Sequence, residues 1–327
     1  MSATVTAPPR FDLQPASAGV HWGEHGTWHW QGHACHWRVI GERTAPALVL
    51  LHGFGAASGH WRRNAAALAE AGWCVYALDL VGFGDSSQPP HRRHRPLDNR
   101  LWARQLQGFL EQIVQGPAVL VGNSLGSLVA VTCAVFFPSW VQGVVAAPLP
   151  DPTLLLPIRR RRARWRRTWK RRVVVLLCRI LPLELLVPLI ARTPLLDLGL
   201  RSAYQDQGAV DGELRRLIAR PALRPQAAQA LRAMSIGMAL RPREATVAPL
   251  LQRMQQPLLV LWGSQDRLVP PQISRQLHPH KADLQLELLQ ELGHCPHDER
   301  PELFNRVVIT WLARNLGSGQ PHEQPWA

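Results

Sequence analysis

The sequence predicts an α/β fold in which a mostly parallel sheet is flanked by helices and interrupted by an inserted helical cap. Continuous apolar runs such as 47–51 and 257–262 are typical of strands buried on both faces. Helix-compatible segments alternate with these runs, as in sheets covered by helices. The alternation stops at 148–249, which reads as helical, proline-interrupted and basic. We therefore expect a flexible arm at 1–18, a core at 19–147 and 250–316, the cap at 148–249 and a tail at 317–327.

Composition places the chain among globular proteins. Its 327 residues are 46% hydrophobic, which is enough to bury a large core. Five scattered cysteines with no CxxC pattern argue against a disulfide framework or a zinc site and favour a reducing compartment. The first 20 residues contain no apolar signal-peptide segment. We expect a cytoplasmic location.

The first half of the chain predicts a hairpin followed by alternating strands and helices. We expect the hairpin at 28–40, strands at 47–51, 73–78 and 141–146, and helices from Ser58 to Ala71 and over 97–115. The hairpin contains His29, His33, Cys35 and His36, which invites comparison with a metal site. Side chains at alternate strand positions point to opposite faces, and no carboxylate joins them. We therefore expect no metal site here.

The second half resumes the alternation after the cap. Strands are expected at 257–262 and 284–289, with a helix near 271–278 between them and a closing helix at 301–316.

The sequence around Ser124 has the pattern of a nucleophile elbow. A strand-forming run, 119–121, ends in Gly122-Asn123-Ser124-Leu125-Gly126, and a helix-compatible run begins directly afterwards. Strand, sharp turn and helix are the context that lifts one hydroxyl above a sheet. Gly122 and Gly126 would allow the strand and helix to approach closely. The pentapeptide alone also fits an ordinary turn, so the prediction depends on partner residues elsewhere in the chain.

Three further elements supply the missing chemistry. Asp266 follows one predicted strand and His294 follows the last one. His294 would take the proton of Ser124, and Asp266 would orient the imidazole. After an earlier strand, His52-Gly53-Phe54-Gly55 offers the backbone N–H of Phe54, which with that of Leu125 would hold an oxyanion.

Other residues compete for these roles. His297 is a second candidate base, expected to face solvent, and Asp151 is a second candidate acid that follows the strand after the nucleophile helix. Asp79 and Asp85 are expected to brace the glycine-rich loop, Cys295 to pack, and His60, His91 and His94 to lie at the surface.

The motifs HGFG, DLVGFGDS, GNSLG, WGSQDRLVP and GHCPHDERPE resemble those of the α/β-hydrolase superfamily over 28–316. More narrowly, HGFG-x3-GHW with LVGNSLG is similar to the pheophytinase and chlorophyll-dephytylase branch of plants and cyanobacteria. This resemblance implies an α/β-hydrolase fold and, for the branch, the phytyl ester of a chlorophyll-type pigment as substrate. Ser127 departs from the branch, which usually has glycine after GNSLG, and so does the basic cap.

The cap contains a strongly basic stretch. Between 159 and 172 there are ten positive residues and no acid, against a net charge of +14 for the whole chain. With its tryptophans, the stretch suits an anionic membrane surface. The candidates are Arg160, Arg161, Arg164, Trp165, Arg167 and Trp169. The apolar residues that come next are interrupted by Arg179, Glu184 and two prolines, so we expect a cap helix rather than a membrane span. A solvated basic face and a nucleic-acid contact are the alternatives, the latter without an accompanying nucleic-acid fold.

Together these observations predict a serine ester hydrolase that needs no metal or organic cofactor. The expected substrate is a lipophilic ester drawn from a membrane, with peripheral association at an internal, thylakoid-type membrane. A general carboxylesterase or lipase-like acyl hydrolase is the enzymatic alternative. A non-catalytic membrane-binding scaffold is an alternative of another class.

Overall fold

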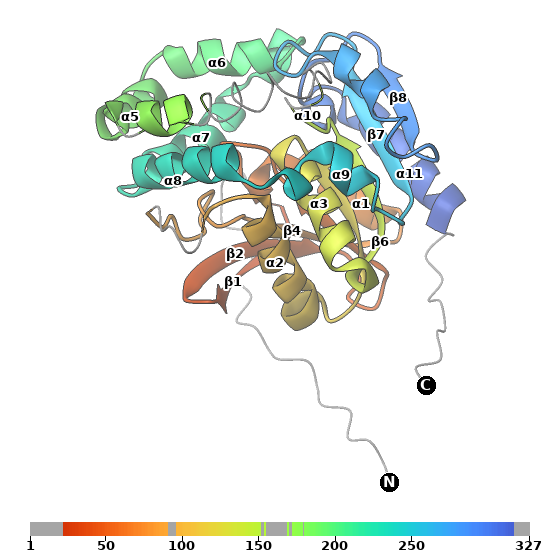
Figure 1. The fold of residues 1–327 in the computed structure, drawn as a ribbon. Coiled ribbons are helices and arrows are strands. Elements are labelled where there is room, and N and C mark those ends of the chain that lie inside the picture. Colours follow the sequence, from red (N-terminus) through yellow and green to blue (C-terminus); the bar gives the residue numbers. More distant parts are fainter. Residues whose placement is uncertain are drawn as a thin grey trace.

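An eight-stranded sheet forms the centre of the molecule (Figure 1). The computed structural model describes residues 22–90, 96–151, 154, 169, 172–178 and 180–316. The strand order is β1-β2-β4-β3-β5-β6-β7-β8. β1 pairs antiparallel with β2, and β2 with β4, whereas the remaining pairs are parallel. The strands are β1 (Glu24–Trp30), β2 (His33–Ile40), β3 (Ala47–Leu51), β4 (Cys74–Leu78), β5 (Ala118–Asn123), β6 (Val141–Ala147), β7 (Leu258–Gly263) and β8 (Gln285–Leu289).

Both faces of the sheet are covered, which explains why its central strands are apolar throughout. Along β3, Val49 and Leu51 enter one apolar cluster, whereas Leu48 and Leu50 enter the cluster on the opposite face. Side chains of α2 (Asn99–Phe109) and α3 (Leu125–Phe136) complete the first cluster. Those of α1 (Ala65–Glu70) and α11 (Pro301–Leu316) complete the second. The predicted α/β fold class is confirmed.

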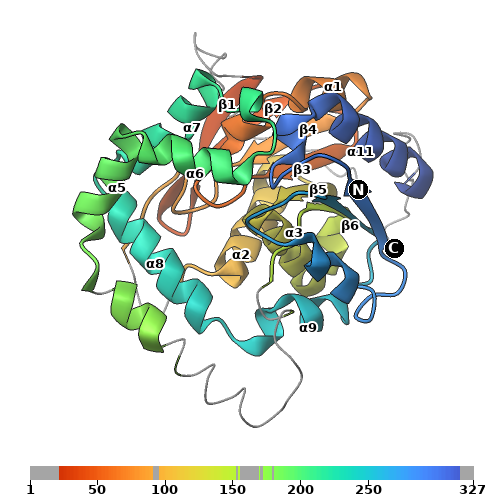
Figure 2. The same cartoon turned by 90° about the horizontal axis from the view of Figure 1, so that it is seen from above.

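Helices fill the described part of the chain between β6 and β7. They are helical residues 172–178, α5 (Leu183–Arg192), α6 (Leu195–Ala203), α7 (Gly212–Ala222), α8 (Ala227–Leu240) and α9 (Val247–Leu251). We call α5 to α8, with residues 172–178, the cap. In Figures 1 and 2, the cap lies over one end of the sheet, with α6 on its outer side. No strand interrupts the cap within the described residues.

Several expected boundaries differ from the structure. The helix expected from Ser58 to Ala71 is a 3-10 turn, η1 (Ser58–Trp61), followed by the short α1. Ser58 does not cap it, because Ala57 is the N-cap residue and the Ser58 N–H donates to Asp79 Oδ1 over 2.6 Å. The helix expected at 97–115 begins after the N-cap Asp98 and ends in a π-helical turn, η2 (Leu110–Val114). Near 271–278 there is only the 3-10 turn η7 (Pro271–Gln276). The closing helix has the expected bounds.

Candidate active site

Ser124 lies at the sharp turn between β5 and α3. Its backbone has φ 52° and ψ −110°, a conformation that is costly for a residue with a side chain. The flanking glycines permit the turn. A Cβ on Gly126 would lie 2.1 Å from the Leu51 carbonyl oxygen, and one on Gly122 would lie 2.4 Å from the Gly126 carbonyl carbon. These are backbone contacts that cannot move aside, so the turn requires glycine on both sides of Ser124.

Ser127 supports this turn from behind. Its hydroxyl donates to the Gly122 carbonyl over 2.7 Å and accepts the Ala147 N–H over 3.0 Å. The Ala147 carbonyl in turn accepts the Ser124 N–H over 3.3 Å. The hydroxyl at 127, where the pheophytinase branch usually has glycine, thus joins the end of β5 to the end of β6.

Asp266 and His294 meet beside the turn. Asp266 Oδ2 lies 2.8 Å from His294 Nδ1, and Asp266 Oδ1 accepts the N–H groups of Leu268 and Val269 over 2.9 and 2.8 Å. A carboxylate only accepts, so Nδ1 carries the proton and Nε2 can act as a base. Asn123 fixes the opposite side of the His294 loop, because its Nδ2 donates to the His294 carbonyl over 3.2 Å.

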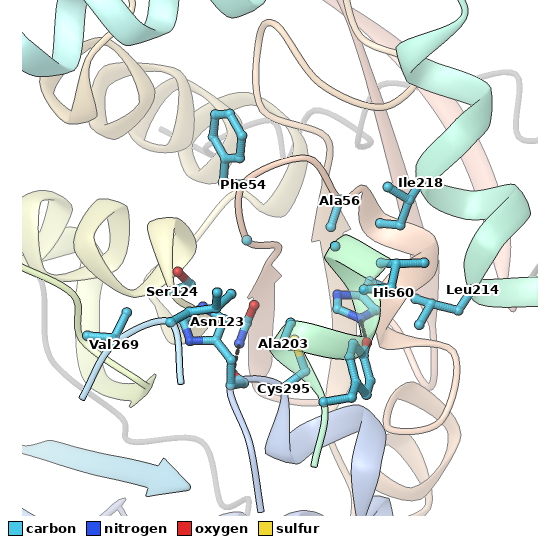
Figure 3. Close-up of a pocket in the computed structure, with 16 residues that line it drawn as sticks. Phe54, Ala56, His60, Asn123, Ser124, Ala203, Leu214, Ile218, Val269 and Cys295 are labelled. Atoms are coloured by element: carbon cyan, nitrogen blue, oxygen red, sulfur yellow. Dashed lines mark hydrogen bonds between the residues drawn. The ribbon is translucent and has the colours of Figure 1, made fainter. Parts of the chain in front are cut away.

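Ser124 and His294 line one cavity of about 340 Å³. In Figure 3, Ser124 and Val269 lie on one side of it, His60 and Leu214 on the other, and Phe54 above. The side chains that line it come from the core loops and from the cap. The cap contributes Gly199, Leu200, Ala203, Tyr204, Leu214 and Ile218. A bound molecule would therefore lie between the turn at Ser124 and the cap.

Of the two expected oxyanion donors, Phe54 lines the same cavity, and Leu125 directly follows Ser124, which also lines it. Leu125 is the first residue of α3, and Phe54 follows β3 with a side chain that is 59% exposed. His52 shapes this loop. Its Nε2 accepts the Leu80 N–H over 3.1 Å, so its Nδ1 donates to the Gly53 carbonyl over 2.8 Å. Burial lowers the pKa of His52, which keeps the imidazole neutral in this arrangement. The oxyanion role of the two N–H groups stays a prediction.

The two competing residues are engaged elsewhere. Asp151 Oδ2 accepts the Val247 N–H over 2.6 Å, and its Oδ1 lies 3.6 Å from Arg241. His297 was expected to face solvent, and that expectation is wrong. It is fully buried, with its ring centroid 4.3 Å from that of Trp61 and 4.5 Å from that of His60. The hydrogen bond to Asp266 therefore favours His294 as the base.

Comparison with known proteins decides the family. Residues 46–301 match the family described as alpha/beta hydrolase fold. The chain is an α/β hydrolase.

Curated relatives of this α/β hydrolase are themselves named as hydrolases. It is 28% identical over 282 residues to the 2-hydroxy-6-oxononadienedioate/2-hydroxy-6-oxononatrienedioate hydrolase of Burkholderia vietnamiensis, covering 82% of this chain and 87% of that protein. It is 34% identical over 107 residues to the bifunctional epoxide hydrolase 2 of Mus musculus. That match covers 33% of this chain and only 19% of the mouse protein.

Solved structures show the same fold. A membrane phospholipase A described as a bacterial virulence factor superposes with a TM-score of 0.69 at 26% identity, covering 89% of this chain and 86% of that one. Cfl2 of Burkholderia cenocepacia superposes with a TM-score of 0.75 at 22% identity, covering 93% and 99%. These relatives do not bear on the pheophytinase branch, and that narrower likeness stays a prediction.

The α/β hydrolase also contains a buried polar network that the sequence did not indicate. His60, expected at the surface, is buried, and its Nε2 lies 2.8 Å from the Tyr204 hydroxyl, which donates to Asp298 Oδ2 over 2.9 Å. Burial would raise the pKa of Asp298, but the hydrogen bond with His60 and the charges of His60 and Arg62 hold it well below its usual range. Arg62 Nη1 lies 2.9 Å from Asp298 Oδ1. The network ties Tyr204 of the cap to η1 and to α10 (Pro296–Glu299).

Glu299 positions the loop that carries His294. Its Oε1 accepts the Gly293 N–H over 2.9 Å, and its Oε2 accepts the N–H groups of Gln205 and Asp206 over 2.8 and 3.0 Å. Burial raises the pKa of Glu299, although these backbone donors oppose the shift. From the sequence we assigned no role to Asp298 or Glu299, because residues 204–206, which bind them, lie more than ninety positions away in the chain.

The structure also shows where most of the other residues named in the sequence analysis lie. Asp79 braces the glycine-rich loop as expected, since its Oδ2 accepts the Asp85 N–H over 2.8 Å, but the Asp85 carboxylate instead lies 3.2 Å from Arg220 of the cap. Cys295 is buried, as expected of a packing residue, and burial raises its thiol pKa well above the usual value. Trp169 is exposed. Arg160, Arg161, Arg164, Trp165, Arg167, His91 and His94 lie outside the described residues.

Proposed function

We propose that this α/β hydrolase is a serine hydrolase that cleaves a carboxylic ester. The observation that carries the proposal is the hydrogen bond of 2.8 Å between Asp266 and His294, whose ring lines one cavity with the strained Ser124. A hydroxyl at such a turn needs a base to become a nucleophile, and a carboxylate-bound imidazole provides one.

The reaction would proceed through an acyl-enzyme. His294 Nε2 accepts the proton of Ser124 as its oxygen attacks the ester carbonyl carbon, and the N–H groups of Phe54 and Leu125 stabilise the oxyanion. The tetrahedral intermediate collapses, the alcohol leaves, and it takes the proton from His294. Water, deprotonated by His294, then attacks the acyl carbon and releases the acid and Ser124.

The lining of the cavity favours a neutral, lipophilic ester. Its described lining residues include no Arg or Lys, so a dicarboxylate such as that in the name of the Burkholderia relative would find no cationic partner there. Leu200, Leu214, Ile218 and Val269 offer apolar contacts instead. The likeness to a membrane phospholipase A supports a lipid ester in general. Within this class, the sequence resemblance suggests the phytyl ester of a chlorophyll-type pigment.

The test compares wild type with Ser124→Ala. Both would be incubated with a p-nitrophenyl ester series and, in detergent, with chlorophyll a and pheophytin a, followed by pigment chromatography. Loss of the nucleophile is expected to lower kcat by about 10⁴-fold or more. Ser202→Ala, at an exposed serine of α6, is the matched control and should keep wild-type turnover.

Each result points to one interpretation. Loss of the phytyl chain with wild type alone would support the pigment ester. Turnover of simple esters alone would leave a general carboxylesterase or lipase-like acyl hydrolase. A folded wild-type protein that acts on neither would overturn the proposal and favour a non-catalytic scaffold.

A further inference from the structure

The exposed apolar side chains of this protein gather in one segment of the cap. Sixteen large apolar side chains are exposed among the described residues, and nine of them lie between 176 and 198. The most exposed are Leu185 (72%), Ile180 (67%) and Leu198 (67%). Single exposed leucines are common on protein surfaces, but a concentration of this kind marks an interaction site. We call the exposed apolar residues of 176–198 the apolar cap surface.

Helical spacing aligns the members of this surface. Leu185 and Leu189 are four residues apart on α5, and Leu195 and Leu198 are three apart on α6, so each pair shares one helix face. α5 contacts α6, α7 and α8 but buries only Ala191. In Figures 1 and 2, α5 lies at the periphery of the cap and α6 on its outer side.

The apolar cap surface lies close to the candidate active site. Gly199, Leu200 and Ala203 of α6 line the cavity that contains Ser124, whereas Leu195 and Leu198 of the same helix are exposed. One helix of 9 residues therefore separates the cavity from whatever covers this surface.

Arg232 of α8 holds the segment in place. Its guanidinium donates to the carbonyls of Cys178 and Leu181 over 2.7 and 3.2 Å, and to Glu184 Oε2 over 2.9 Å. These contacts join the end of helical residues 172–178 to the first turn of α5. The backbone between these helices is thus held by hydrogen bonds in the conformation that exposes its apolar side chains.

The charges around the surface are positive. Its two acids are paired, Glu184 with Arg232 and Asp197 with Arg215. Arg172, Arg192 and Arg201 are exposed and have no ion pair within the described part of the chain. In the sequence, the basic stretch 159–172 directly precedes this surface. An apolar surface bordered by unpaired arginines matches the chemistry of an anionic lipid interface.

We propose that the apolar cap surface docks on the surface of an anionic lipid bilayer. No single described helix is long and apolar enough to cross a membrane. Helical residues 172–178 and α5 are long and apolar enough for a membrane span only when taken together, and the chain bends by 74° between them. Apolar side chains inserted at the level of the head groups, with arginines on phosphates, fit this geometry. This docking does not depend on the ester hydrolysis proposed above. Only the idea that docking gives the enzyme access to a membrane ester rests on that proposed function.

The test is vesicle binding with variants of the surface. Full-length wild type, Leu185→Gln/Leu198→Gln and Leu288→Gln would be sedimented with phosphatidylglycerol-containing vesicles and with phosphatidylcholine vesicles at low salt. Leu288 is an exposed leucine on β8, which lies away from α5 and α6 in Figure 1. We expect wild type and Leu288→Gln to bind the anionic vesicles, and the double variant to partition about tenfold more weakly, because two leucines no longer enter the lipid.

Three results would overturn the proposal. Wild type could fail to bind anionic vesicles. Alternatively, the double variant could bind them as tightly as wild type, and this result would assign the binding to the basic stretch alone. Wild type could also be a dimer in light scattering while the double variant is a monomer, which would assign the surface to a second copy of the chain. Turnover of a soluble p-nitrophenyl ester, expected to be unchanged in the double variant, separates failure of docking from failure of the proposed catalysis.

Discussion

Ser127 illustrates how a single buried hydroxyl can stabilise the turn at Ser124. It satisfies the buried Ala147 N–H and the Gly122 carbonyl together. Ser127→Ala leaves that N–H without its acceptor, and we expect the free energy of unfolding to fall by about 1–3 kcal/mol in urea denaturation. Ser202→Ala, at an exposed position, should stay within about 0.5 kcal/mol of wild type. Equal stability of the two variants would contradict this role for Ser127.

His297 should make the stability of the protein depend on pH. Burial, with the nearby charge of His60, lowers the pKa of His297 well below its usual value, and neither ring nitrogen has a hydrogen-bond partner within the described residues. In the unfolded chain the ring protonates near pH 6.5. The unfolded state therefore binds more protons below that pH, so the contribution is complete above pH 6.5 and is lost as the pH falls toward the folded pKa.

The measurement is the free energy of unfolding between pH 7.5 and 5. His297→Phe, which places another ring against Trp61 and Phe304, should reduce the loss on acidification by up to about 1.4 kcal/mol per pH unit relative to wild type. His278→Phe makes the same change at an exposed histidine and should leave the slope unchanged. Parallel curves for wild type and His297→Phe would show that His297 does not titrate on unfolding.

At the scale of elements, α7 is held to the core by its first turn. Asp211 is the N-cap residue of α7, and its Oδ1 accepts the Leu214 N–H over 2.7 Å. Its Oδ2 accepts from Arg63 Nη2 over 2.9 Å, and Arg63 also donates to the Asp298 carbonyl over 2.9 Å. A single carboxylate thus caps a helix of the cap and joins it to the core.

Asp211→Ala should loosen this junction. Loss of the N-cap costs about 1 kcal/mol, with a smaller loss from the ion pair, and we expect faster amide hydrogen exchange in the first turn of α7. Asp197→Ala in α6 removes a half-buried ion pair with Arg215 of α7, 3.3 Å across, but leaves the N-cap of α7 intact, and is the matched control. If the two variants exchange alike in α7, the cap is held by other contacts.

At the scale of the whole molecule, stability is distributed unevenly. Every residue of β5 and β7 is buried, whereas α5 buries one residue and α6 buries none. Regions with few buried contacts open at lower free energy than the core. Native-state hydrogen exchange should therefore give α5 and α6 opening free energies well below the global value that β5 reports. Uniform protection across cap and core would contradict this.

The sequence predicted those parts of the molecule whose signals are local. A strand buried on both faces is apolar throughout, as at 47–51, and a loop with candidate site residues follows such a strand directly. From these signals we located the core strands and predicted that Asp266 and His294 each follow the end of a strand. The pattern of 58–71 did not reveal a 3-10 turn, because a tertiary hydrogen bond to Asp79 takes the Ser58 N–H.

Burial of polar residues could not be predicted in the same way. His60, Tyr204 and Asp298 are separated by more than ninety positions in the sequence, yet they form one hydrogen-bonded chain. Only the folded arrangement gives each of them a partner. A histidine read in isolation is expected at the surface, and for His60 and His297 that expectation was wrong.

The hydrogen bond of 2.7 Å from the His294 N–H to the Ala203 carbonyl has a kinetic implication. Ala203 is the last residue of α6, the cap helix that lines the cavity. This bond therefore joins the main chain of the proposed base directly to the cap. A motion that raises the end of α6 away from this loop must break this bond, whereas the bonds to Asn123, Asp266 and Glu299 still hold the loop of His294. Opening of the cavity at this point would therefore remove one support of the proposed base, and proton transfer would be slower until the end of α6 returns.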